Sequence, residues 1–88
     1  MNKLDRSQIA QHFIDITNDI CPMTFVKTKL MIEKIPQNEI LEVRLKGKEP
    51  LINVPRSVLE YGHIILYLEP VSDDQAPLGI HRLLVKKV

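Results

Sequence analysis

Apolar and polar residues alternate along residues 12–17 and 39–46, and this period-two pattern predicts two β-strands, with two further strands predicted later in the sequence. The clearest stretch is residues 39–46, in which Leu41, Val43 and Leu45 form one face and charged side chains form the other. Because the two faces differ in this way, we expect one side of the sheet to be buried and the other to contact water. The charged residues of the outer face are Glu42, Arg44 and Lys46.

A first helix is predicted from Pro22 to about Ile35, because proline is favoured at the first helical position and Pro36 cannot continue the helix. This start makes Cys21 the expected N-cap residue. At about 100° per residue, the apolar residues of the helix fall on two faces. The broad face, which we expect to pack in the core, consists of Phe25, Thr28, Met31, Ile32 and Ile35.

A second apolar stripe on this helix is formed by Met23, Val26 and Leu30 and is bordered by Lys27 and Lys34. Such a stripe either packs against another helix or a loop, or remains exposed as a docking surface for a partner protein. The sequence leaves both possibilities open.

A second, short helix is predicted near residues 53–61, with Pro55 in its first turn and Gly62 as its C-terminal cap. The order β-α-β-α-β-β predicts an α/β (α+β) two-layer sandwich, a four-stranded mixed sheet with two helices on one face. We expect a single domain over residues 12–88, preceded by a loosely ordered lead-in over residues 1–11. The other predicted strands are residues 12–17, 63–69 and 80–88, with a loop over residues 70–79.

The composition narrows the classes of function. The 88 residues suffice for one modest core but not for a core with a deep substrate cavity. One cysteine and three scattered histidines have no metal-ligand spacing, so we expect neither a metal nor a cofactor. The net charge of +1 comes from interleaved acidic and basic residues, which disfavours direct binding of nucleic acid.

No apolar run approaches the roughly 20 residues of a membrane-spanning helix, and the first six residues lack the apolar stretch of a signal peptide. The lone cysteine cannot form an internal disulfide and suits a reducing compartment. We therefore expect a cytoplasmic protein with no membrane partner.

Cys21 is the main candidate for chemistry. A thiol at a helix start faces free backbone N–H groups and the positive end of the helix dipole, which favour the nucleophilic thiolate. We expect free N–H groups at residues 23 and 24 to supply this stabilisation. The alternative is that Cys21 is a buried and inert apolar side chain, as many lone cysteines are.

The turn before Cys21 contains Asn18, which tolerates positive φ better than other non-glycine residues. We therefore expect Asn18 to make the sharp turn from the first strand into the helix.

Taken in order, these features resemble the TusA (SirA-like) family of small sulfur-carrier proteins, which are sulfurtransferases. That family has an Asp-x-x-Gly-x-x-Cys-Pro-x-Pro motif at the start of its first helix, then Gly-Glu-x-Leu-x-Val on its second strand and Gly-His before its third. The matching residues here are Asp15, Cys21, Pro22, Glu39, Leu41, Val43, Gly62 and His63. Asn18 replaces the motif glycine and Thr24 replaces the second proline, which restores a backbone N–H near Cys21.

The resemblance implies that Cys21 accepts sulfane sulfur as a persulfide and relays it, toward tRNA thiolation or another sulfur-transfer pathway. Implied partners are a cysteine desulfurase or other sulfur donor protein and a downstream sulfur-acceptor protein. We expect Asn18, Pro22 and Thr24 to support the turn and the helix cap. The alternative is a non-catalytic regulatory or protein-interaction module of the same fold, in which Cys21 is structural.

Overall fold

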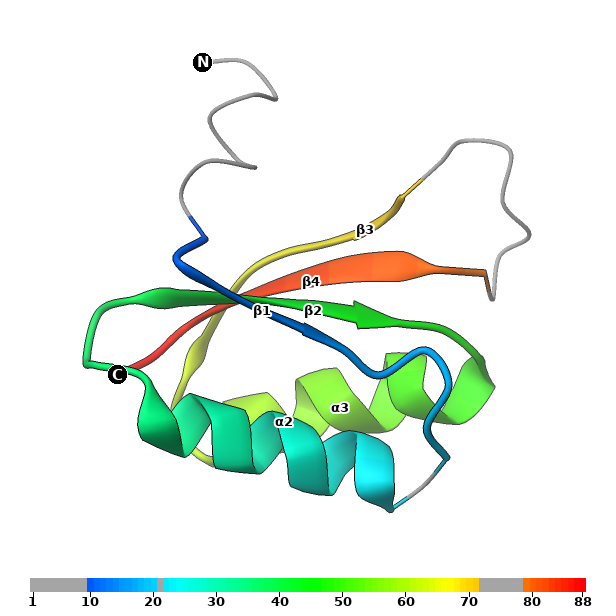
Figure 1. Cartoon of the computed structure of the whole chain (residues 1–88), viewed down its shortest axis with the longest axis horizontal. Coiled ribbons are helices and arrows are strands. Elements are labelled where there is room, and N and C mark those ends of the chain that lie inside the picture. The colour runs from blue at the N-terminus through cyan, green and yellow to red at the C-terminus, as the bar shows by residue number, and fades with distance from the viewer. Residues whose placement is uncertain (1–9, 21, 72–78) are drawn as a thin grey trace.

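The computed structural model describes residues 10–20, 22–71 and 79–88 of the chain. Two helices cover one face of a four-stranded sheet, so the predicted two-layer architecture is confirmed (Figure 1). Most of the predicted loop over residues 70–79 lies outside the described residues. The elements in chain order are β1 (His12–Asp15), α2 (Met23–Lys34), β2 (Ile40–Leu45), α3 (Lys48–Glu60), β3 (Ile64–Pro70) and β4 (His81–Lys86).

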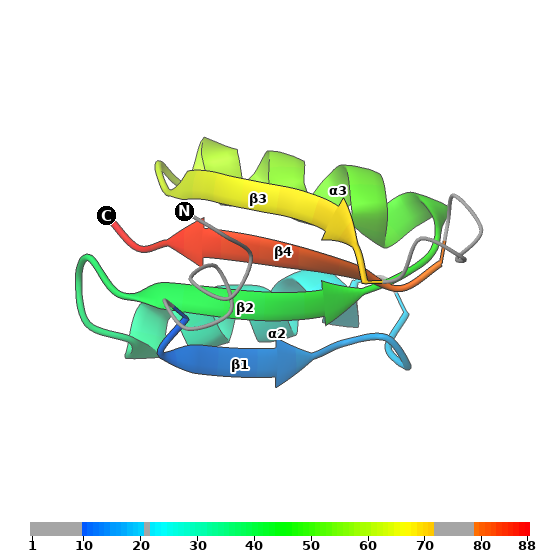
Figure 2. The same ribbon diagram turned by 90° about the horizontal axis from the view of Figure 1, so that it is seen from above.

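The sheet has the strand order β1-β2-β4-β3, which Figure 2 shows from the side opposite the helices. β1 and β2 are parallel, with Ile14 opposite Val43, as expected for a βαβ unit joined by α2. β4 pairs antiparallel with both β2 and β3, and the register with β3 shifts between Ile65 and Tyr67. The carboxyl ends of β1 and β2 therefore meet at one edge of the sheet, where α2 and α3 begin.

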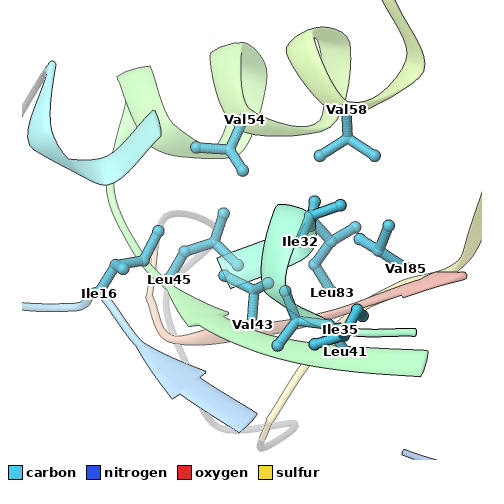
Figure 3. Close-up of a cluster of buried hydrophobic side chains, with 10 residues drawn as sticks. All are labelled: Ile16, Ile32, Ile35, Leu41, Val43, Leu45, Val54, Val58, Leu83 and Val85. Carbon is cyan, nitrogen blue, oxygen red and sulfur yellow. The ribbon is translucent and has the colours of Figure 1, made fainter. Parts of the chain in front are cut away.

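The core lies between the sheet and the helices, as the alternation in β2 predicts (Figure 3). The inward residues of β2 are fully buried, and α2 and α3 each turn their own apolar side chains toward them. Burying an aliphatic side chain of this size contributes about 1.5–3 kcal/mol. The core residues are Ile16, Ile32, Ile35, Leu41, Val43, Leu45, Val54, Val58, Leu83 and Val85.

The outer face of the sheet contacts water only in part, which corrects the prediction of a wet face. Glu42 on that face is only 8% exposed, and Leu84, its cross-strand neighbour, is fully buried. The Glu42 carboxylate accepts a hydrogen bond of 2.8 Å from Arg44 Nε and lies 3.9 Å from Arg82 Nε. The Arg44 guanidinium also lies over the Phe13 ring, 5.5 Å from its centroid. The side chains of Arg44 and Arg82 thus lie around the Glu42 carboxylate on this face.

The second helix is longer than predicted, since α3 begins at Lys48 rather than near residue 53. Gly47 is its N-cap, and the Leu51 N–H donates to the Gly47 carbonyl at 3.1 Å. Pro50 lies in the first turn, where a missing N–H costs nothing, and the helix then continues through Pro55. Neither described helix is long and apolar enough to cross a membrane.

The end of α3 is as predicted, with Gly62 just beyond the helix at a positive φ of 89°. The Gly62 N–H donates to the Leu59 carbonyl at 2.9 Å, and the His63 N–H donates to the Val58 carbonyl at 3.2 Å. This pair of bonds is a Schellman motif, which satisfies carbonyls that the helix itself leaves without partners.

Candidate functional site

The candidate site is the connection between β1 and α2, at the carboxyl edge of the parallel strand pair. Cys21 lies outside the described residues, so the site is built from the residues on either side of it. Ile16 anchors one end of this connection in the core, and the buried Thr24 anchors the other. Ile20 and Pro22, the two neighbours of Cys21 in the sequence, are both exposed.

Asp15 holds the first part of this connection. Its carboxylate accepts hydrogen bonds from the Thr17 N–H at 2.9 Å and from the Thr17 hydroxyl at 2.7 Å. These bonds, the hydroxyl first, lower the pKa of Asp15, and the positive charges of Arg44 and Lys46 act in the same direction. A carboxylate that binds the backbone two residues later forms an Asx turn, which gives the motif aspartate a structural role.

Asn18 lies in the turn, but the expectation that it would use positive φ is wrong. Among the described residues, Asn38 is the non-glycine residue with positive φ, at 71°. The turn is closed by the Asp19 N–H, which donates to the Ile16 carbonyl at 3.1 Å. Common four-residue β-turns accept negative φ at both central positions, so an asparagine fits where the motif of the resembling family has glycine.

The start of α2 also differs from the prediction, because Pro22 rather than Cys21 is the N-cap. The Val26 N–H donates to the Pro22 carbonyl at 3.0 Å, and this is the first i to i−4 hydrogen bond of the helix. The Met23 N–H donates to the Ile20 carbonyl at 2.7 Å and is therefore not free, contrary to our expectation. That donor is therefore used before the helix begins.

Thr24, which stands where the family motif has a second proline, turns its side chain into the protein rather than toward the surface. Its carbonyl accepts a hydrogen bond of 2.8 Å from the buried Thr28 hydroxyl, one turn further along α2. The influence of Thr24 on Cys21 stays a prediction.

The apolar stripe on α2 is exposed and does not belong to the core. Met23 is 44% exposed, Leu30 is 52% exposed, and Val26 is partly exposed between them. Lys27, which borders the stripe, forms an ion pair of 2.8 Å with Asp19. This pair was not predicted from the sequence, because its members are eight residues apart and only the turn brings them together.

A shallow hollow beside the turn is a second feature that was not predicted from the sequence. It joins the β1–α2 connection to the start of α3, at the edge where the two parallel strands end. The parallel pairing expected for β1 and β2 could have predicted this hollow, because loops at the carboxyl ends of neighbouring parallel strands lie side by side. The lining residues are Thr17, Asp19, Ile20, Lys46, Gly47, Lys48, Glu49 and Pro50.

The histidines have separate contacts. His12 Nε2 lies 2.7 Å from Glu39, and His81 Nδ1 lies 2.7 Å from the Gly79 carbonyl. His63 Nδ1 accepts a hydrogen bond of 3.2 Å from the Val88 N–H. Within the described ranges, no group of three or more His, Cys, Asp or Glu side chains is placed to hold a metal ion.

These features define a class of small two-layer proteins in which a tight turn leads into a Cys-Pro helix start at the sheet edge. The family model described as Sulfurtransferase TusA matches residues 12–87. The chain therefore belongs to the TusA family, and the resemblance found in the sequence is confirmed.

Comparison with individual proteins agrees with this assignment. A protein from Archaeoglobus fulgidus is 38% identical over 66 residues, which are 75% of this chain and 75% of that protein. A protein from Methanocaldococcus jannaschii is 36% identical over 61 residues, which are 69% of this chain and 81% of that protein. Both carry the name of a candidate sulfur carrier protein.

The crystal structure of a SirA-like protein from Desulfitobacterium hafniense is similar, with a TM-score of 0.68. The match covers 86% of this chain and 96% of that chain, at 18% sequence identity. At this identity the match supports a common fold.

Proposed function

We propose that this protein is a sulfur carrier, in which Cys21 holds a sulfane sulfur as a persulfide and passes it to an acceptor protein. The observation that carries the proposal is membership of the TusA family over residues 12–87, together with the Cys-Pro sequence at the start of α2. The names of the relatives from Archaeoglobus and Methanocaldococcus support the same role.

The proposed loading step is a transfer between two cysteines and needs no external oxidant. The Cys21 thiolate attacks the terminal sulfur of a donor cysteine persulfide and forms a new S–S bond. The donor's own S–S bond breaks, and its cysteine leaves as a thiolate with the bonding electron pair. Unloading repeats the exchange with Cys21 as the leaving group.

The surroundings of Cys21 suit such an exchange. A carrier must bring its cysteine into contact with a partner's cysteine, and the exposed Ile20 and Pro22 lie on either side of Cys21 in the sequence. The Met23 N–H is already bonded to Ile20, so stabilisation of the thiolate rests on the helix dipole and on donors beyond that position. Asn18, Pro22 and Thr24 then act as positioning residues.

The exposed stripe on α2 is the surface that we assign to the partner. Met23, Val26 and Leu30 supply apolar contact area, and Lys27 supplies charge at the border. The donor is a cysteine desulfurase or another sulfur donor protein, and tRNA thiolation is one destination of the sulfur. The single cysteine cannot form an internal disulfide and must be a free thiol to accept sulfur, which a reducing compartment favours, and we place the protein in the cytoplasm.

Loading with a cysteine desulfurase tests this proposal. The protein is incubated with the desulfurase, its pyridoxal phosphate and free cysteine, and its intact mass is measured before and after addition of a reductant. The expected result is a gain of one sulfur atom that the reductant removes, and its absence in Cys21→Ser. Serine is a good residue for a helix start, so we expect stability to change by less than about 1 kcal/mol.

A loss of several kcal/mol in Cys21→Ser would contradict the proposal and favour a non-catalytic interaction module with a structural cysteine. Alkylation of the folded protein gives the same distinction, since an inert buried thiol reacts with iodoacetamide only after unfolding.

A further inference from the structure

A small cleft between α2 and α3 lies away from the candidate site and takes no part in the proposed sulfur transfer. Figure 1 shows the two helices side by side on the same face of the sheet. The cleft has a volume of about 120 Å³, which is close to the roughly 150 Å³ of an engineered cavity that binds benzene. Its lining residues are Phe25, Thr28, Lys29, Ile32, Glu33, Val58, Tyr61 and His63.

The floor and walls of the cleft suit a flat apolar group. Thr28, Ile32 and Val58 are buried, and the Thr28 hydroxyl is already bonded to the Thr24 carbonyl. The rings of Phe25 and Tyr61 are stacked, with a tilt of 4° and centroids 5.8 Å apart. Aromatic surfaces of this kind favour contact with a further ring.

The polar groups around the cleft favour a ligand with an anionic end. Lys29 Nζ lies 5.8 Å from the centroid of the Tyr61 ring and pairs with Glu33 at 3.3 Å. This pair is exposed and contributes little, so a ligand carboxylate can replace Glu33 as the partner of Lys29. Lys87 bonds to the carbonyls of Glu33 and Ile35, which adds a second positive charge nearby.

His63 adds a neutral donor. Its burial, and secondly the charge of Lys87, lower the pKa of His63, so the ring is neutral at pH 7. Because Nδ1 accepts the Val88 N–H, the proton of the neutral ring resides on Nε2.

We propose that this cleft is a binding site for a small aromatic carboxylic acid, whose ring lies on the apolar floor and whose carboxylate pairs with Lys29. The site is independent of the sulfur-carrier role. On α2, the cleft residues and the exposed stripe of Met23, Val26 and Leu30 occupy different faces of the helix.

The probe for this site is benzoate, titrated into the isotope-labelled full chain and followed by NMR. We expect saturable shifts at the amides of Thr28, Lys29 and Val58, with a dissociation constant in the millimolar range that is usual for so small a ligand. Benzylamine has a similar ring but the opposite charge, and we expect it to bind at least about threefold more weakly.

Variants make the test specific. Tyr61→Ala removes one wall and should weaken benzoate binding roughly fivefold to tenfold. Leu59→Ala is the control, because Leu59 is similarly exposed on α3 but does not line the cleft. Lys29→Gln should weaken benzoate binding, whereas Glu33→Gln should strengthen it by freeing Lys29.

Three results would overturn the proposal. They are an absence of saturable shifts at the cleft amides, equal effects of Tyr61→Ala and Leu59→Ala, and equal binding of benzylamine and benzoate. The amide spectrum of each variant verifies its fold. Sulfur loading is measured separately on Tyr61→Ala and should be unchanged, so failure of this site and failure of the carrier role remain distinguishable.

Discussion

At the scale of single residues, the turn before Cys21 depends on pairings that are only partly visible in the sequence. The pattern Asp15 to Pro22 predicted a turn from strand to helix, and that turn is present. The φ of Asn18 and the cap position of Pro22 could not be predicted, because they depend on which backbone groups pair across the turn. The role of Cys21 stays a prediction that rests on family membership and on chemistry.

Replacement of Asp15 by asparagine should change the acid stability of the protein. The folded pKa of Asp15 lies below its ordinary value of 3.8, so its stabilising effect is complete above that pH and is lost as the pH falls through the folded value. Asparagine can still accept the Thr17 bonds but does not titrate in this range. Unfolding by urea between about pH 5 and pH 2 should therefore show a flatter pH dependence for Asp15→Asn.

The remaining carboxylates titrate in both proteins, so the difference between the two curves isolates Asp15. Identical slopes for the wild-type protein and Asp15→Asn would contradict this assignment.

At the scale of elements, the helices were predicted with different success. The ends of α2 were predicted to within one residue, because the spacing of its apolar residues and the prolines on either side indicate the same bounds. α3 was predicted too short, because Pro55 was interpreted as a start signal although Pro50 also satisfies that pattern. A proline in the sequence can mark the first turn of a helix, or it can lie inside a helix that tertiary packing holds together. The sequence around the proline does not distinguish these two cases.

The two glycines at the ends of α3 should differ in their tolerance of alanine. Gly47 has φ 96° and ψ 159°, a region that only glycine enters readily, and an added Cβ would lie 3.6 Å from Pro50. Gly62 has φ 89°, and no atom lies within 4 Å of its added Cβ. We expect Gly62→Ala to lower the free energy of unfolding by about 1 kcal/mol and Gly47→Ala by about 1–3 kcal/mol.

Urea denaturation of the two variants measures both values under the same conditions. A larger loss in Gly62→Ala than in Gly47→Ala would show that the backbone at Gly47 relaxes after substitution.

The exposed stripe on α2 gives a prediction about the partner protein. Val26→Asp should slow sulfur transfer from the donor, because a charge in the apolar contact area weakens docking. The alkylation rate of free Cys21 and the thermal midpoint should be nearly unchanged, since the stripe lies outside the core. Leu59→Asp places the same charge on an exposed position of α3 and serves as the control.

Unfolding of Val26→Asp would assign the stripe to the packed interior of the protein. An equal slowing of transfer by Leu59→Asp would point to a general charge effect rather than to a docking surface.

At the scale of the whole molecule, the layers were predictable and the strand order was not. Alternation within the first two strands and the sequence of elements predict two helices on a mixed sheet. The placement of β4 between β2 and β3 depends on pairing between distant segments. The shielded outer face has the same origin, because Phe13, Glu42, Leu84 and Tyr67 become neighbours only through that order.

Leu84 tests how much the outer face contributes to stability. It is fully buried but does not belong to the core cluster between the sheet and the helices. Leu84→Ala should lower the free energy of unfolding by about 2–5 kcal/mol, as for other buried leucines. Leu68→Ala, at an exposed position of β3, should cost about 1 kcal/mol or less in the same urea titration. Equal losses in the two variants would mean that the outer face adds no packing energy.

The central position of β4 has a consequence during synthesis on the ribosome. β1, β2, β3 and both helices all precede residue 81. β2 and β3 do not pair with each other, because β4 lies between them and pairs with both. Until residues 81–86 have emerged, the nascent chain therefore has strand edges whose N–H and C=O groups lack their native partners. Such edges readily pair with other chains. The interval before β4 emerges is thus the stage at which we expect this protein to be most prone to aggregate or to bind a chaperone.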